Sequence, residues 1–192
     1  AEYYHNAYPN GIDYGGIEIL SCKTEETPLE FSICGVDKNI LEVFLLEEVF
    51  PLESVAVTIE YKIDIANVVA RTGINDSTVN LANFYPILCG IEGNCFYEGV
   101  YYPCGDPYFS DCASYLVTFT CDSEYVVASS GQLVEGKSEN GFSTTTYKLE
   151  NARSFCLVLS KNFECITDQS LGVQVNYYYY DDKTPISSLE YA

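Results

Sequence analysis

Hydrophobic and polar residues alternate along one long stretch of the chain. Every second residue from Val55 to Ile65 is hydrophobic, and the residues between them are mostly polar or charged. A period of two places the apolar side chains on one face of a β-strand and the polar ones on the other. The pattern therefore predicts an antiparallel strand with one buried face and one solvated face.

Similar short apolar runs recur about every ten residues, with Gly, Asn, Asp, Ser and Pro between them. Asn140 and Gly141 form the dipeptide that a two-residue hairpin turn prefers. The spacing predicts an all-β, mostly antiparallel β-sandwich, and we interpret residues 1–192 as a single β-domain. The runs are Ile17–Cys22, Leu29–Cys34, Leu41–Leu45, Tyr115–Cys121, Tyr125–Ala128, Thr144–Leu149, Phe155–Ser160 and Val173–Tyr179.

Two parts of the chain depart from this pattern. Residues 66–112 hold Asn, Gly, Pro and aromatic residues without alternation, which predicts a long irregular loop whose aromatic side chains fill a secondary core. Thr184 and Pro185 resemble an N-cap and a first helical residue, so we expect a helix to start within 184–192. Because the sequence ends within two turns of that start, we expect the chain to be a fragment of a larger protein.

The charge balance limits the partners of the chain. Nine basic and 28 acidic residues give a formal net charge of −19 at pH 7. Binding to nucleic acid or to anionic lipid is disfavoured, because both need clustered Lys and Arg. Hydrophobic residues form 47% of the chain, enough for a packed core, but no apolar run approaches the roughly 18 residues of a membrane helix. We therefore expect no nucleic-acid partner and no membrane insertion.

Histidine is too scarce for histidine-based catalysis. The chain has one, His5, whereas a zinc motif of the His-Glu-x-x-His type needs two. A Ser-His-Asp triad needs its histidine beside a poised nucleophile, and His5 lies in an N-terminal stretch that is expected to be loosely held. The sequence therefore predicts no catalytic residue, no metal ligand and no activity from this chain alone.

The nine cysteines leave two interpretations open. In the first, an oxidising compartment pairs neighbours, with Cys89–Cys95 and a pairing among Cys104, Cys112 and Cys121 as local candidates. In the second, the thiols are small buried hydrophobes, which the apolar runs that hold several of them favour. The odd number leaves at least one thiol without a partner in the chain. The nine are Cys22, Cys34, Cys89, Cys95, Cys104, Cys112, Cys121, Cys156 and Cys165.

Several polar residues could have either a structural or a functional role. Asp106 lies between Gly and Pro and most simply caps its own turn. Asp181 and Asp182 lack the surroundings of a calcium loop and suit the start of a helix, where the macrodipole favours negative charge. The tyrosines at 177–180 should alternate between the two faces of a strand. Asn75 opens an N-glycosylation sequon, which is relevant only to a secreted eukaryotic protein.

Five motifs follow one another along nearly the whole chain. They are Asn80–Leu88, Tyr101–Asp111, Tyr115–Thr120 with Tyr125–Gly131, Ala152–Ser160 and Val173–Tyr180. In this order they resemble the N-terminal β-domain of the aminopeptidase N family of zinc metallopeptidases, in particular its low-GC bacterial type. Each motif is weak by itself, and the order of the five carries the resemblance.

The resemblance implies a saddle-like β-sandwich that packs on a catalytic domain, narrows access to the active site and takes no part in the chemistry. The zinc motif of the family belongs to that catalytic domain, so zinc is implied only for a parent peptidase. The tract from His5 to Asn10 resembles one that follows earlier strands, which implies a truncated N-terminus with open sheet edges. Cys89, Cys104 and Cys112 stand where the family favours small or aliphatic residues.

Two functions follow from this sequence. The first is a non-catalytic accessory β-domain of a zinc aminopeptidase-like protein, with the catalytic domain of the same protein as its partner. The alternative is an extracellular structural or filament-type assembly subunit, in which strand edges and a spare cysteine join neighbouring copies. An extracellular or cell-surface location is the favoured one.

Overall fold

The structure is a computed structural model and describes residues 7–93, 95–98, 110–170 and 172–189. His5, Cys104 and Asp106 lie outside these residues. Among the described residues, every strand pair is antiparallel, and the predicted all-β class is confirmed.

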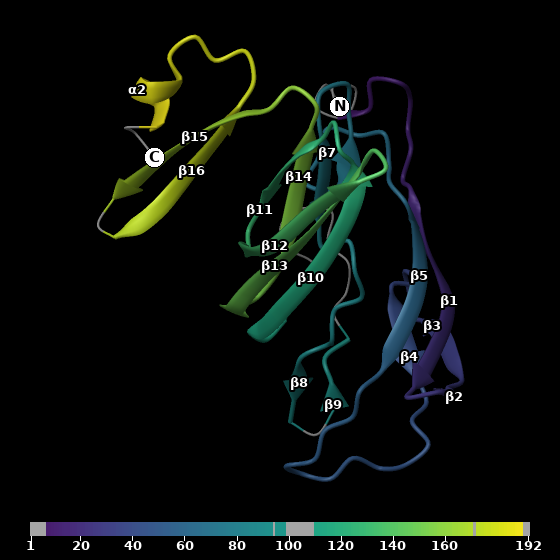
Figure 1. Cartoon of the computed structure of the whole chain (residues 1–192). Coiled ribbons are helices and arrows are strands. Elements are labelled where there is room, and N and C mark those ends of the chain that lie inside the picture. The colour runs from purple at the N-terminus through teal and green to yellow at the C-terminus, as the bar shows by residue number, and fades with distance from the viewer. Residues whose placement is uncertain (1–6, 94, 99–109, 171, 190–192) are drawn as a thin grey trace.

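Two sheets pack face to face as the predicted β-sandwich (Figure 1). Their strands are β6 (Gly73–Ile74), β7 (Val79–Ala82), β10 (Ala113–Asp122), β11 (Val126–Ser129), β12 (Gln132–Glu139), β13 (Phe142–Ala152) and β14 (Cys156–Ser160). One sheet has the order β10-β13-β12 and the other the order β11-β14-β7-β6. The predicted turn at Asn140 and Gly141 joins β12 to β13, and both residues have the positive φ that such a turn requires, 53° and 82°.

Phe155 is fully buried at the centre of the sandwich core. Its ring lies 6.1 Å from the ring of Tyr115 and 6.5 Å from that of Tyr147, both on the opposite sheet. Its backbone N–H donates to the hydroxyl oxygen of Tyr85 at 2.7 Å. Gly131 lies against the same ring, where an added Cβ would approach Phe155 Cε2 to 2.9 Å. The other buried members of this cluster are Leu81, Leu157 and Leu159.

A third sheet lies beside the sandwich (Figure 1). It has the order β2-β1-β5, and the hairpin β3–β4 accompanies it. These strands are β1 (Gly16–Thr24), β2 (Thr27–Pro28), β3 (Phe31–Cys34), β4 (Ile40–Val43) and β5 (Thr58–Asp64). β5 shows the predicted alternation, with Ile59, Tyr61 and Ile63 half-buried and the residues between them exposed. The strand begins at Thr58, so Val55 belongs to the exposed connection before it.

A third hairpin projects from the sandwich and leads into a short helix (Figure 1). It consists of β15 (Glu164–Ser170) and β16 (Val173–Tyr179), and α2 (Pro185–Leu189) follows. The tyrosines alternate as predicted: the rings of Tyr177 and Tyr179 stack 5.6 Å apart, while Tyr178 and Tyr180 pack on Phe163. The helix begins as predicted, because the first helical hydrogen bond runs from the Ser188 N–H to the Thr184 carbonyl at 3.0 Å.

The prediction of one irregular loop over residues 66–112 needs correction. This segment contributes β6, β7, β8 (Ile91–Glu92) and β9 (Cys95–Phe96). β7 lies between β14 and β6, and the only apolar alternation that marks it is Val79 and Leu81, which is too short to stand out. The aromatic residues Phe84 and Tyr85 pack against the main core cluster and not in the secondary core that the sequence predicted.

Candidate interaction surface

The chain exposes far more surface than a compact protein of its size. Its accessible surface is 14276 Å², whereas area scaling gives about 9,100 Å² for a folded monomer of 21.4 kDa. Among the described residues, eight hydrophobic ones are buried, and large apolar side chains are exposed along many elements. The excess identifies this molecule as one with extensive apolar surface available for contact.

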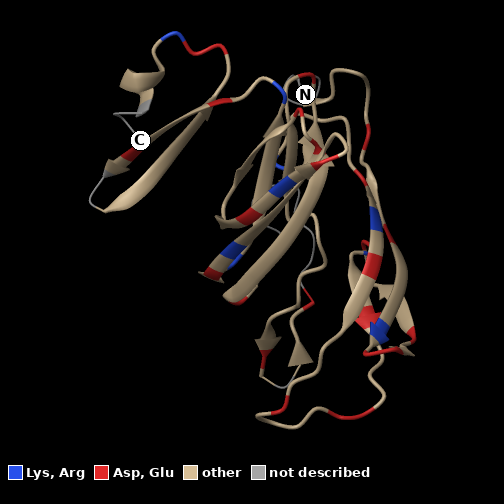
Figure 2. Cartoon of the chain, in the orientation of Figure 1, with Lys and Arg blue, Asp and Glu red and all other residues tan. Residues whose placement is uncertain are grey.

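The connection from β4 to β5 concentrates this exposure. We call residues 44–57 the apolar acidic segment. Glu47, Glu48 and Glu53 are its charged residues, and it contains no Lys or Arg. Figure 2 shows acidic stretches and no basic one along it. Its exposed hydrophobic members are Phe44, Leu45, Leu46, Val49, Phe50, Leu52, Val55 and Val57.

A turn holds the middle of the apolar acidic segment in shape. The Glu53 N–H donates to the Phe50 carbonyl at 3.0 Å, and the Phe50 N–H donates to Glu53 Oε2 at 3.0 Å. Leu52 has a positive φ of 74° inside this turn, and its side chain is fully exposed. At the start of the segment, the Phe44 N–H donates to the Glu30 carbonyl at 2.9 Å. The backbone therefore presents the apolar side chains outward.

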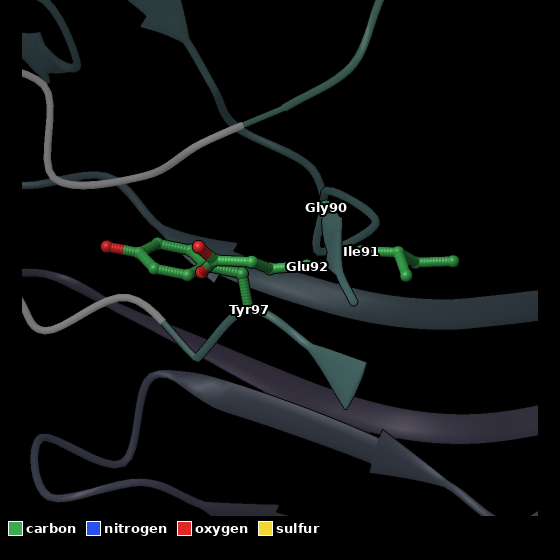
Figure 3. A pocket seen from close by; sticks show the side chains of 4 residues that line it. All are labelled: Gly90, Ile91, Glu92 and Tyr97. Carbon is green, nitrogen blue, oxygen red and sulfur yellow. The ribbon is translucent and has the colours of Figure 1, made fainter. Parts of the chain in front are cut away.

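The β8–β9 hairpin adds exposed apolar residues and a shallow pocket (Figure 3). The pocket has a volume of about 330 Å³ and is lined by Gly90, Ile91, Glu92 and Tyr97. The side chains of Glu92 and Tyr97 point to one side and that of Ile91 to the opposite side. The Tyr97 N–H donates to the Gly90 carbonyl at 2.7 Å, which closes the base of the hairpin.

The β8–β9 hairpin and the apolar acidic segment occupy the same end of the molecule, far from α2 (Figure 1). Burial raises the pKa of Cys34 on β3, and the negative charges of Glu42 and Glu98 and the Cys89 thiol raise it further.

The β12 edge of the sandwich is poorly suited to pairing with another chain. β12 is an edge strand, and a bulge between Leu133 and Glu135 interrupts its register. Glu135, Lys137 and Glu139 add charges along it. Bulges and charges are the features by which sheet proteins block edge-to-edge association. The geometry therefore disfavours contact with neighbouring copies through this edge.

The register of the strands separates the cysteines that lie close in sequence. Cys95 pairs with Glu92, so Cys89 lies three positions along the hairpin, about 10 Å away and beyond the roughly 7 Å limit for a disulfide. Cys112 directly precedes β10 and Cys121 lies near its end, which sets them on the order of 25 Å apart. The eight described cysteines, all but Cys104, are free thiols.

Burial of these thiols is uneven. Cys22 is buried, while Cys95, Cys112 and Cys165 are exposed. Burial raises the pKa of Cys22, and burial followed by the charge of Asp122 raises the pKa of Cys121. The remaining described thiols, Cys34, Cys89 and Cys156, are half-buried.

The carboxylate of Asp182 and the amide of Asn75 each stabilise local structure. Asp182 Oδ1 accepts the Thr184 N–H at 2.8 Å and its Oδ2 accepts the Tyr177 hydroxyl at 3.1 Å, which fixes the start of α2 on the hairpin and lowers the pKa of Asp182. Asn75 of the sequon donates its amide to Thr78 Oγ1 at 2.9 Å and closes its own turn. The described residues contain no group of three or more His, Cys, Asp or Glu that could hold a metal ion.

Asp13 is a structural residue that the sequence pattern did not reveal. Its Oδ2 accepts the Asn67 N–H at 2.8 Å and its Oδ1 accepts the Gly15 N–H at 2.9 Å. The bond to Asn67 joins the segment before β1 to the one after β5, 54 residues later. These backbone donors, Asn67 first, lower the pKa of Asp13.

Comparison with known proteins gives a likeness in structure alone. No protein-family model matches the sequence, and no curated protein matches it. A two-domain M1 zinc metallopeptidase mutant bound to L-arginine matches with a TM-score of 0.54 and 15% identity, over 89% of this chain and 39% of that chain. The chain has the fold of part of an M1 zinc metallopeptidase.

Two M1 zinc metallopeptidase structures from Deinococcus radiodurans give the same result. One matches with a TM-score of 0.53 and 17% identity, over 88% of this chain and 39% of that chain. The other, a mutant bound to a Tyr-Ser-Ala substrate, matches with a TM-score of 0.54 and 18% identity, over 87% of this chain and 38% of that chain. The M1-type fold confirms the resemblance that the sequence motifs predicted, and the chain spans less than two fifths of these metallopeptidase chains.

The apolar acidic segment of this M1-type domain was not singled out from the sequence. Its two ends belong to the predicted run Leu41–Leu45 and to the alternation that starts at Val55, but residues 46–54 follow neither a period of two nor one of 3.6. The available signal was a dense mixture of large apolar residues and Glu without Lys or Arg. The described residues also include no helix that is long and apolar enough to span a membrane.

Proposed function

We propose that this chain is a non-catalytic accessory module of a zinc aminopeptidase-like protein and that it packs on a catalytic domain. The likeness to M1 metallopeptidases supports this role, because it covers nearly all of this chain and less than two fifths of theirs. A module that normally contacts a larger domain also accounts for the excess of exposed apolar surface. The alternative of an assembly subunit gains no support from the comparisons.

The chemistry of the described residues fits a supporting role. Zinc in a parent peptidase would polarise the peptide carbonyl and activate water. The donor set of the described residues does not fit a zinc site, and the carboxylates of Asp13 and Asp182 are engaged in turns. The raised pKa of the Cys22 and Cys121 thiols makes them poor nucleophiles. We therefore assign no catalytic step to this chain.

Such a module would bury apolar surface against the catalytic domain and restrict the access of peptides to the active site. Packing against a catalytic domain would remove apolar side chains from water at about 25 cal/mol per Å². A wall beside an active-site cleft would also limit which peptides enter it, which is the role that the family resemblance implies.

The test compares the isolated 192-residue chain with the natural gene product that contains it. We expect no hydrolysis of aminoacyl p-nitroanilides by the isolated chain and chelator-sensitive hydrolysis by the longer product. Deletion of the module from that product should lower kcat/KM or abolish folding. Chelator-sensitive turnover by the isolated chain, or a natural product that has no further domain, would contradict the proposal.

A further inference from the structure

The apolar acidic segment, residues 44–57, is the densest group of exposed hydrophobic side chains in the described residues. Leu46 is 64% exposed, Phe50 is 60% exposed and Leu52 is fully exposed. Monomeric proteins rarely expose contiguous apolar patches above a few hundred Å², and larger ones mark contact surfaces. The segment therefore has the character of an interface that is uncovered in the isolated chain.

We infer that the apolar acidic segment, together with the β8–β9 hairpin, is the surface on which the catalytic domain docks, and that the docking surface of that domain is apolar with a basic rim. This inference rests on the proposed function and adds the contact face and the chemistry of the partner. Phe50 and Leu52 are the central anchors of the interface. Large apolar side chains at the centre of an interface carry most of its binding energy.

The geometry prepares these anchors for binding. The turn closed by Phe50 and Glu53 fixes the backbone on both sides of Leu52. The segment is also held at its start by the bond from Phe44 to Glu30 and at its end by β5. A segment that is already ordered loses less conformational entropy on association, which strengthens binding.

Charge selects the partner. Glu47, Glu48 and Glu53 lie among the apolar residues, and Glu92 and Glu98 lie on or beside the β8–β9 hairpin. Two copies of this surface would bring like charges together, and an anionic lipid surface would be repelled in the same way. A surface that places Lys or Arg around an apolar centre is complementary to this pattern.

The first experiment uses the longer natural product and hydrogen exchange. We expect residues 44–57 to exchange at least about tenfold more slowly in that product than in the isolated chain. The double variant Phe50→Ser, Leu52→Ser should abolish this difference and leave the Tm of the isolated chain unchanged. The double variant Glu47→Lys, Glu48→Lys should reduce the difference in exchange between the two proteins, and the reduction should be largest at low salt.

Matched controls lie on the sandwich. Leu116→Ser alters a residue that is 72% exposed on β10, and Glu135→Lys reverses a charge on β12. Both should leave the exchange of residues 44–57 unchanged. Equal exchange of this segment in the isolated chain and in an active longer product would overturn the inference and leave the proposed function standing.

Crosslinking provides a test that needs no variant. A carbodiimide joins a carboxylate to a lysine in contact with it. We expect links from Glu47, Glu48 or Glu53 to lysines of the catalytic domain in the longer product, identified by peptide mass spectrometry. Links to that domain only from other carboxylates of the module would place the contact elsewhere and refute the inference.

Discussion

Asp13 shows how one carboxylate can join distant parts of a small-cored domain. Its two oxygens accept backbone N–H groups of Asn67 and Gly15, so the side chain bridges the segments that flank β1 and β5. These donors favour the charged form of the carboxylate, which is why its folded pKa lies below the ordinary value of 3.8.

The contribution of Asp13 to stability should depend on pH. Because its folded pKa is lowered, the contribution is present above about pH 4 and is lost as the pH falls through the folded pKa. We expect Asp13→Asn to lower the Tm at pH 7, and this Tm difference from the wild type to shrink in acid. Thermal unfolding from pH 7 to pH 3 measures it. Asp37→Asn, on an exposed turn, serves as control, and an equal loss of Tm there would contradict the role of Asp13.

Phe155 is the residue whose truncation should cost most. Its ring is fully buried among Tyr115 and Tyr147, so Phe155→Ala leaves a cavity that the two sheets cannot close. The free energy of unfolding should fall by about 3–5 kcal/mol, measured by urea denaturation. Leu116→Ala, at an exposed position, should change it by less than about 0.5 kcal/mol. Similar values for the two variants would place the core elsewhere.

Single residues differed in how well the sequence predicted their roles. The positive φ of Asn140 and Gly141 followed from the dipeptide itself, because few residues other than Gly and Asn adopt that conformation readily. The need for glycine at 131 arises from the ring of Phe155, 24 positions away in sequence. Asp13 likewise acts on a backbone group 54 residues away, which no local pattern records.

At the scale of elements, the strand pairing and strand length set the distances between cysteines and so decide which of them can form a disulfide. The hairpin β8–β9 and the extended strand β10 hold the two local cysteine pairs too far apart for disulfides. This geometry disfavours those two local disulfides. The interpretation of the cysteines as small buried hydrophobes stays a prediction, since Cys22 alone among the described cysteines is buried and Cys104 lies outside the described residues.

Thiol labelling can test this arrangement. In the native chain at pH 7, Cys95, Cys112 and Cys165 should react with N-ethylmaleimide before Cys22 and Cys121, because burial shields the latter two and raises their pKa. Raising the pH should speed the slow pair. Peptide mass spectrometry reads the order, and the denatured chain provides the reference rates. Recovery of a Cys89–Cys95 or Cys112–Cys121 disulfide peptide would show that the register is wrong.

Most strands that carry an apolar run were predicted, including the four-residue strands β3, β4 and β11, whereas β7 and β12 were not. β5, β10 and β16 carry clear alternation because one face of each is at least half-buried. β12 is exposed along its whole length, so it has no apolar face to detect. β7 is only four residues long, and its place between β14 and β6 depends on pairing with residues far along the chain.

At the scale of the whole molecule, the accessible surface area is larger than that of a compact protein of the same mass. A compact domain of 192 residues has a radius of gyration of about 16 Å. Because the hairpin β15–β16 projects from the sandwich and the apolar acidic segment lies at the opposite end, the isolated chain is extended (Figure 1).

This shape has a measurable signature. Small-angle X-ray scattering of the isolated monomer should give a radius of gyration clearly above about 16 Å. The dye ANS should bind, and added salt should promote association, because it screens the net charge of −19. A control domain of similar length and ordinary surface area should show neither effect. A value near 16 Å without dye binding would indicate that the apolar surface is covered.

The position of β14 has a consequence for synthesis on the ribosome. β14 lies between β11 and β7, and its Leu157 is opposite Leu81, which was made 76 residues earlier. At about 5–20 residues per second, β7 waits for several seconds before the strand that covers its inner edge has been translated. During that interval β7 can pair with β6 on one side only, and its other edge has no strand beside it. The nascent chain thus carries an exposed strand edge, the feature that promotes association between chains, until β14 emerges.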